Sequence, residues 1–181
     1  MTELVPMTVT DFLAFVAETV PRYAADKVAS GQWSVEESVD LARQALDDLL
    51  PRGLDTPDNH LFAIRAGSES VAVGRLWFAV QQRAGKRIAF VYEVSIEPEH
   101  QRQGHASRAF MALEATVRDL GLAGVALHVF GHNAAALGLY AKLGYVPTNI
   151  NMYKPVQRVG GSDALVDGAA AAIVETRMLA R

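Results

Sequence analysis

The sequence contains no cysteine, and this absence removes several kinds of chemistry together. Without cysteine among its 181 residues, the chain has no disulfide, no thiol nucleophile and no thiolate metal site. Its five histidines, at positions 60, 100, 105, 128 and 132, form no His-x-x-x-His pair on a predicted helix. We therefore expect no metal site in this protein.

The sequence is also poor in long apolar runs and in clustered basic residues. No apolar stretch approaches the length that spans a bilayer, and the first residues, MTELVPMTVTDF, lack the basic-then-apolar order of a signal peptide. The 17 basic residues are scattered among 20 acidic ones, and the formal net charge of −3 argues against a nucleic-acid binder. We expect a cytoplasmic protein with no membrane or nucleic-acid partner.

What is present is the composition of an ordinary globular protein, with half of its residues hydrophobic and a fifth charged. The length suits a single domain, which we place at residues 1–154. Residues 155–181 form a C-terminal extension that is rich in alanine near helical spacing. A docked helix, a dimer arm and a frayed tail all agree with this pattern, and we favour a weakly docked helix.

Hydrophobic periodicity predicts a mixed α/β fold. Short turns between the three central β runs indicate an antiparallel meander, and the strand after the next helix must run parallel to the one before it. Pro21 either bends the first helix or opens a second one. The predicted elements are a strand at 3–7, helices over 8–30 and 34–50, strands at 61–64, 71–80 and 88–96, a helix from about 103, a strand at 125–130, a helix at 133–143, and short strands at 145–146 and 150–153.

The stretch from Tyr92 to Ser107, YEVSIEPEHQRQGHAS, is the part of the sequence most suggestive of a binding site. It reads as a strand, a polar loop and the beginning of a helix. Such a junction presents unpaired backbone N–H groups and the positive end of the helix dipole. Gly104 and Ala106 are small, so an anion can approach the backbone closely. We predict a phosphate-bearing ligand here.

The spacing Gln-x-x-Gly-x-Ala at residues 101–106 resembles the pyrophosphate loop of the GNAT family of N-acetyltransferases. A second signal follows in LHVFGHNAAALGLYAKLGY, residues 127–145. There Asn133, Tyr140, Lys142 and Gly144 stand at the family's spacing, and Asn133 and Tyr140 are two helical turns apart, so they share a face. The resemblance covers about residues 2–154, in which the first ninety support it mainly by the order of elements.

The resemblance implies the GNAT fold, a central mixed, mostly antiparallel sheet flanked by helices, in which an antiparallel meander precedes a strand-helix-strand cofactor unit. It also implies acetyl-CoA as the acyl donor. In related enzymes, backbone groups at the positions of Val94 and Ile96 bond the pantetheine arm and help to polarise the thioester carbonyl. The residues expected to bind the donor are Val94, Ser95, Ile96, Gln101, Arg102, Gln103, Gly104, His105, Ala106, Ser107 and Asn133. Asn133 is also a natural helix N-cap.

Acetyl transfer to an amine needs a base, because a lysine-like amine with a pKa of about 10.4 must lose a proton at a cost of about 4.6 kcal/mol at pH 7. An α-amino group with a pKa near 8 costs only about 1.4 kcal/mol. Glu93 is the candidate base, at a position where related enzymes often hold an acid, although it could instead be a surface carboxylate paired with an arginine. Tyr140 matches the family's usual general acid. The alternative is that Tyr140 has only a structural role, as a half-buried aromatic residue.

The leading hypothesis is therefore an N-acetyltransferase that passes acetyl from acetyl-CoA to a primary amine by direct attack. With no cysteine, an acyl-enzyme on a thiol is excluded. A longer acyl-CoA donor stays open, as does a non-catalytic acyl-CoA-binding or sensing module that keeps the loop alone. The acceptor, a small-molecule amine or a peptide or protein amine, cannot be read from the sequence, and a homodimer is plausible.

Overall fold

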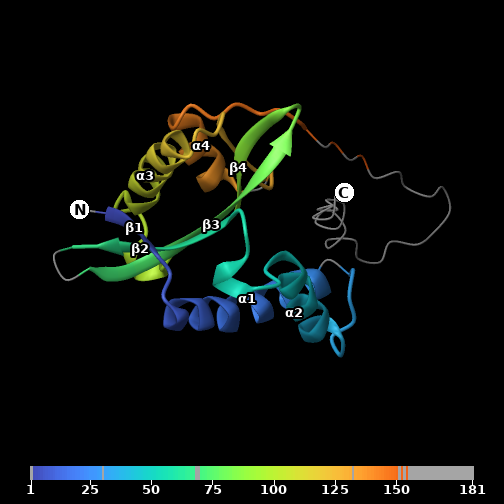
Figure 1. Cartoon of the computed structure of the whole chain (residues 1–181). Helices are drawn as coiled ribbons and strands as arrows, with labels where there is room; N and C mark the ends of the chain where they lie inside the picture. The colour runs from blue at the N-terminus through green and yellow to red at the C-terminus, as the bar shows by residue number, and fades with distance from the viewer. Residues whose placement is uncertain are drawn as a thin grey trace. The chain divides into compact units, whose positions relative to one another are not determined.

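The computed structural model describes residues 2–29, 31–67, 70–131, 133–150, 152 and 154. Five strands form one sheet in the order of the sequence: β1 (Thr2–Pro6), β2 (Asn59–Ala66), β3 (Val71–Arg83), β4 (Lys86–Ile96) and β5 (Val125–Leu127). The first four strands pair antiparallel, and β5 runs parallel to β4. The predicted meander and the parallel strand that follows it are both confirmed (Figure 1).

Helices account for most of the described backbone outside the sheet. They are α1 (Val9–Ala29), α2 (Ser38–Leu49), α3 (His105–Asp119) and α4 (Ala134–Lys142), with short 3-10 turns at Gly53–Asp55 and Pro98–His100. Pro21 lies inside α1, which continues as a single helix on both sides of it. Within the described part of the chain, no helix has the length and apolar character needed to cross a membrane.

The chain divides into two compact units. One holds Met1–Phe15 and Leu49–Val146, and with them the sheet, α3 and α4; the other holds Val16–Asp48 and the residues from Pro147 onward. In the second unit, just ahead of α2, the Glu37 amide donates to the Ser34 hydroxyl at 3.3 Å, and this hydroxyl donates to the Glu37 carboxylate at 3.1 Å.

One face of the sheet in the first unit packs against α3. The buried cluster joins strand residues such as Ile64, Leu76 and Phe78 to Phe110 and Leu113 of α3, all with no measurable exposure. Burying such side chains contributes about 1.5–3 kcal/mol each. Phe110, Leu113 and Val117 stand at helical spacing and form the buried stripe of α3, whereas Leu120, just past the last helical residue, is 40% exposed.

The pairing of β3 with β4 shifts by one residue in the middle of the two strands. Trp77 lies opposite Glu93, but the next residue, Phe78, lies opposite Val91, so Tyr92 is an extra residue in β4. This is a β-bulge, which bends the strand that carries it. Among the described residues, β5 pairs with β4 only from Ala89 to Val91, and the pairing therefore stops where the bulge begins.

The last strands predicted from the sequence are wrong where the structure describes them. Residues 145–146 and 150 are not in strands, and Val146 and Ile150 are 76% and 77% exposed. The strand predicted to reach Phe130 ends at Leu127. A β-prone run becomes a strand only when a neighbour completes its ladder, and none pairs with these residues in the described structure. Asn151, Tyr153 and the extension 155–181 lie outside the described residues.

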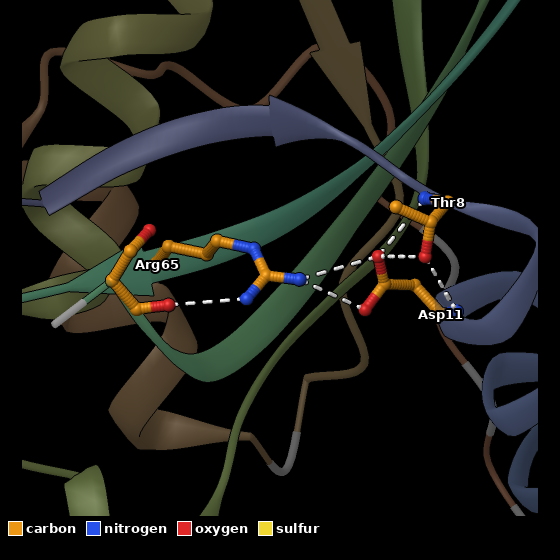
Figure 2. A network of polar contacts seen from close by, with 4 residues as sticks. Thr8, Asp11 and Arg65 are labelled. Carbon is orange, nitrogen blue, oxygen red and sulfur yellow. Dashed lines mark hydrogen bonds and ion pairs between the residues drawn. The ribbon is translucent and has the colours of Figure 1, made fainter.

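A polar network fixes the start of α1 to β2 (Figure 2). The Asp11 amide donates to the Thr8 hydroxyl at 3.1 Å, and the Thr8 amide donates to the Asp11 carboxylate at 2.9 Å, which is a reciprocal cap. Arg65 donates to both carboxylate oxygens of Asp11, at 3.1 and 3.3 Å, and to the Ser70 carbonyl at 3.0 Å. The hydrogen bond from the Thr8 hydroxyl is the main cause that lowers the pKa of Asp11, and Arg65 lowers it further, while partial burial opposes them.

We expect Asp11→Ala to lower the free energy of unfolding by about 1 kcal/mol at pH 7, because it removes a cap and a partner of Arg65. Since the folded-state pKa of Asp11 is below its unfolded value, this contribution is present above about pH 4 and is lost as the pH falls through the folded pKa. Urea unfolding of both proteins at several pH values measures the difference. Asp26→Ala, an exposed position on the same helix, should stay within about 0.5 kcal/mol. A difference that does not shrink as the pH falls would contradict the assignment.

Candidate active site

The edge of β4 beyond the bulge carries backbone groups that β5 does not pair. The Glu97 amide donates to the Val73 carbonyl of β3 at 2.9 Å. Because successive residues of an antiparallel strand direct their N–H and C=O groups to opposite sides, the backbone groups of Ile96 and Val94 face away from β3. They therefore lie on the side where the ladder to β5 has ended. Their side chains pack onto the core cluster.

Gly74 allows β3 and β4 to lie close together at this point, and the sequence analysis missed it. A Cβ at this position would collide with the Ser95 carbonyl oxygen and would lie 3.0 Å from the Ile96 Cα. Both neighbours are backbone atoms of the strand that forms the open edge, so they could not yield without moving that edge. An isolated glycine inside a β run is the signal that could have revealed it.

The loop before α3 is held by its own side chains. The Gln101 side chain donates to the Ile96 carbonyl at 3.0 Å, and the Gln103 side chain donates to the Glu99 carbonyl at 3.0 Å. Gln101 thus takes one of the backbone groups on the open β4 edge. These contacts join the loop to the end of β4 and give it one defined conformation.

Two residues of this loop have left-handed backbone conformations. Arg102 has φ of 59° and Gly104, the residue that precedes α3, has φ of 79°. A positive φ is costly for arginine and nearly free for glycine. From Arg102 to Ser107, no amide donates to a backbone carbonyl within the described residues, and the first helical bond is that of Arg108 to the Gly104 carbonyl, at 3.2 Å. A run of unpaired amides at the positive end of a helix can bind an anion.

His105 opens α3 and is half-buried. Its Nδ1 lies 3.0 Å from the Thr2 hydroxyl and 3.2 Å from an Arg108 nitrogen. Partial burial, followed by the positive charges of Arg108 and His100, lowers the pKa of His105 below the usual histidine value. The imidazole is therefore mostly neutral at neutral pH.

Glu93 lies on the face of the sheet opposite α3. Its carboxylate is 3.3 Å from Nε of Arg75, which also donates to the Ser95 hydroxyl at 3.0 Å. The side chains of Arg75 and Glu93 are only 12% and 11% exposed, and the Arg75 guanidinium lies 6.0 Å from the Phe15 ring centre. The pairing with arginine that the sequence allowed is present, but the carboxylate is not on an open surface. Arg75 is a second residue that the sequence analysis missed.

Tyr140 lies on the opposite face, in the aromatic contacts between α4 and α3. Its ring meets Phe110 edge-on at 5.5 Å and lies 5.6 Å from the ring of Tyr145. Burial raises the pKa of Tyr140 above its usual value. Burial, followed by the carboxylate of Glu114, raises the pKa of Tyr145 more strongly. The Tyr145 hydroxyl is buried and has no hydrogen-bond partner among the described residues.

Asn133 caps α4, its side-chain oxygen accepting the Ala136 amide at 3.1 Å. The cap role foreseen from the sequence is thus confirmed, and a role in donor binding stays a prediction. Within the part of the chain that the structure describes, no three His, Cys, Asp or Glu side chains gather as metal ligands would.

The two candidate catalytic residues therefore lie on opposite faces of β4, with the open edge at Val94 and Ile96 between them. Glu93 shares its face with Arg75 and Ser95. Tyr140 packs against the same buried cluster as Val94 and Ile96. The loop of unpaired amides follows directly at the end of this strand. This part of the fold therefore has a carboxylate on one face of β4, a phenol on the other and a run of unpaired amides after the end of the strand.

Replacing Tyr145 with Phe should raise the free energy of unfolding of the ligand-free protein by about 1 kcal/mol, because the change removes a buried hydroxyl that no described residue bonds. Chemical denaturation measures the difference. Tyr23→Phe, in the second unit, serves as the matched control and should change stability little. A loss of stability in Tyr145→Phe would show that a partner such as a buried water satisfies the hydroxyl.

The model of the Acetyltransferase (GNAT) family matches residues 25–145. The chain is 34% identical over 151 residues to YycN of Bacillus subtilis, an uncharacterized N-acetyltransferase, across 83% of this chain and 96% of YycN. The crystal structure of YycN superposes with a TM-score of 0.76 at 33% identity, covering 87% of this chain and all of that one.

Two further similarities are weaker, one in coverage and the other in sequence identity. A mycothiol acetyltransferase of Paenarthrobacter aurescens is 35% identical over 105 residues, which cover 56% of this chain but 32% of that protein. AAC(6')-Iy, solved in complex with the bisubstrate analog CoA-S-monomethyl-acetylneamine, has a TM-score of 0.57 at 12% identity, over 87% of this chain and 99% of its own. At that identity the likeness concerns the fold alone.

These similarities show that the protein is an enzyme that transfers an acetyl group. The chain belongs to the GNAT family of acetyltransferases, which use acetyl-CoA as the acyl donor. The fold foreseen from the sequence, a mixed and mostly antiparallel sheet flanked by helices, is confirmed.

Proposed function

We propose that this chain transfers the acetyl group of acetyl-CoA to a primary amine by direct attack, with Glu93 as the base and Tyr140 as the acid. The observation that carries the proposal is the open edge of β4, which lies between these two side chains and leads to the unpaired amides at the start of α3.

The residues on this edge suit the parts of acetyl-CoA in order. The amides from Arg102 to Ser107 would bond the pyrophosphate, with the charge of Arg102 beside them. The backbone groups of Val94 and the amide of Ile96 would bond the amide-rich pantetheine arm as an added strand would, while the Ile96 carbonyl accepts from Gln101. Ser95 lies between these two residues, and its hydroxyl accepts a hydrogen bond from Arg75. Asn133 has its side-chain oxygen committed to the α4 cap and keeps an N–H₂ group that can donate.

Glu93 would take the proton that the amine must lose. Arg75 lies 3.3 Å from the carboxylate and holds it in one orientation. A carboxylate offers several acceptor positions on its two oxygens, so Glu93 can accept from the amine directly or through a water while it contacts Arg75. The nitrogen then forms its bond to the carbonyl carbon as the bond from that carbon to sulfur breaks. The acceptor is a primary amine, of a small molecule or of a peptide or protein.

Tyr140 would act on the sulfur as that bond breaks. Burial raises the pKa of Tyr140 above its usual value, so the phenol is a weaker acid than a thiol of pKa about 8.5. Complete proton transfer from tyrosine to sulfur is then uphill by at least about 2 kcal/mol. Tyr140 therefore acts mainly by donating a hydrogen bond to the developing thiolate, which takes its final proton from solvent.

A second function, an acyl-CoA-binding or sensing module without turnover, is favoured by the state of the same two residues. Glu93 is already engaged by an arginine, and Tyr140 is packed among aromatic rings with a raised pKa. Both features weaken acid–base catalysis while leaving the donor site intact.

Free-thiol release from acetyl-CoA, measured against a panel of amines, polyamines and peptides with free N-termini, separates the two functions. An enzyme releases thiol in the presence of one acceptor class, and Tyr140→Phe should lower its kcat about 10- to 100-fold with little change in KM for acetyl-CoA, because a bond to the departing sulfur is lost. Tyr23→Phe is the control. Tight donor binding without release for any acceptor would instead support the sensing module.

Glu93→Gln should lower kcat by about 100-fold or more with a lysine-like amine and by a smaller factor with an α-amino group. The reason is that deprotonation at pH 7 costs about 4.6 kcal/mol for the first and about 1.4 kcal/mol for the second. Steady-state rates with an acceptor of each kind give the comparison. Glu99→Gln, an exposed carboxylate six residues on, should match the wild type. Equal losses with both amines would argue against a base at this position.

A further inference from the structure

The side chain of Arg108 ties the loop before α3 to the first strand. Its Nε donates to the Thr2 hydroxyl of β1 at 2.8 Å, across 106 residues of sequence. Its Nη2 donates to the Gln103 carbonyl at 2.7 Å and lies 3.2 Å from Nδ1 of His105. Because an arginine can only donate, that Nδ1 is the acceptor and the proton of the neutral imidazole is on Nε2. Figure 1 shows β1 running beside the beginning of α3.

The position of this charge is electrostatically unfavourable in the protein alone. Arg108 lies in the first turn of α3, which has no acidic residue, and no carboxylate in the described structure pairs with it. The N-terminal end of a helix carries a partial positive charge that disfavours a cation. An anion at the same place would reverse the sign of this interaction.

One end of the guanidinium also has no partner. A Cβ on Gly104 would lie 2.8 Å from Nη1 of Arg108, so the absence of a side chain at Gly104 gives Nη1 its room above the loop backbone. Within the described residues, Nη1 makes no hydrogen bond, whereas Nε and Nη2 are both engaged. The side chain is thus fixed at two nitrogens and has two N–H groups free beside the unpaired loop amides.

We propose that Arg108 binds the pyrophosphate of the acyl donor through Nη1, while Thr2 and the Gln103 carbonyl hold its guanidinium in place. The inference rests on the proposed function for the identity of the donor. Membership of an acetyl-CoA-dependent family, rather than the helix end alone, indicates that a phosphate-bearing ligand comes to this loop. Gly104 then has two roles, the left-handed turn and the space for Arg108.

The test compares two donors that differ in the group Arg108 is proposed to bind. Acetyl-CoA carries the pyrophosphate, and S-acetylpantetheine lacks it together with the nucleotide. In Arg108→Met, we expect kcat/KM with acetyl-CoA to fall about 10- to 100-fold, mainly through KM, since one charge-assisted hydrogen bond is lost. The value with S-acetylpantetheine should equal that of the wild type. Arg118→Met, at the other end of α3, is the matched control.

A second readout does not depend on turnover. Calorimetric titration with CoA should give a Kd that is about 10- to 100-fold higher for Arg108→Met than for the wild type. Thr2→Val, which removes only the hydroxyl that holds Nε, should shift the Kd in the same direction by a smaller factor. Arg108→Lys should restore only part of the affinity, because the lysine ammonium is a single compact charge, whereas the arginine guanidinium is planar and presents several N–H donors.

The outcomes separate this inference from the proposed function. Equal losses with both donors, or an unchanged Kd for CoA, would overturn the role of Arg108. CoA binding by the wild type without any acetyl transfer would overturn the proposed catalysis, and the Kd comparison would still decide the role of Arg108. Thermal unfolding of each variant identifies any that fails to fold. If Arg108→Met does not fold, the same comparisons are made with Arg108→Lys.

Discussion

The geometry of the site depends on one extra residue in β4. Tyr92 has no counterpart on β3, and the bend that such a bulge introduces coincides with the end of pairing to β5. Without that interruption the two strands could continue as a regular parallel ladder, and the backbone groups of Val94 and Ile96 would be used within the sheet. The bulge also carries an aromatic anchor, since the Tyr92 ring stacks on Trp77 at 4.6 Å and its hydroxyl accepts from Gln81 at 2.9 Å.

Other parts of the structure hold this opening in place. Gly74 lets β3 follow the bent strand closely, and the ion pair of Arg75 with Glu93 lies at the same level on the face of the sheet opposite α3. The core under Val94 and Ile96 is built by α3, whose first turn also supplies the amides of the loop. A single helix therefore supports the open edge from below and forms one end of it. This arrangement couples the packing of Phe110 to the position of the proposed donor site.

The order and type of most elements could be predicted because their patterns are local. Gln101, Gly104 and Tyr140 could be proposed as site residues from the sequence because the motifs that contain them have fixed spacing. The bulge at Tyr92 leaves no such pattern, since it depends on the register between two strands, and the partnership of Arg75 with Glu93 crosses those strands. The proposed role of Arg108 has no local pattern for the same reason, because its partner Thr2 lies 106 residues away in the sequence. The failed strands at 145–146 and 150 had β-prone residues but no neighbour in the described structure.

The open edge has a consequence for the protein when no ligand lies along it. Unpaired N–H and C=O groups on a strand form a template on which another extended chain can add by main-chain hydrogen bonds. The contact of the Gln101 side chain with the Ile96 carbonyl blocks one of these groups, and the bend at Tyr92 makes the remaining edge short. The same two features that shape the site thus protect the chain from self-association through it, and a peptide built to lie extended on this edge would compete with any ligand that uses it.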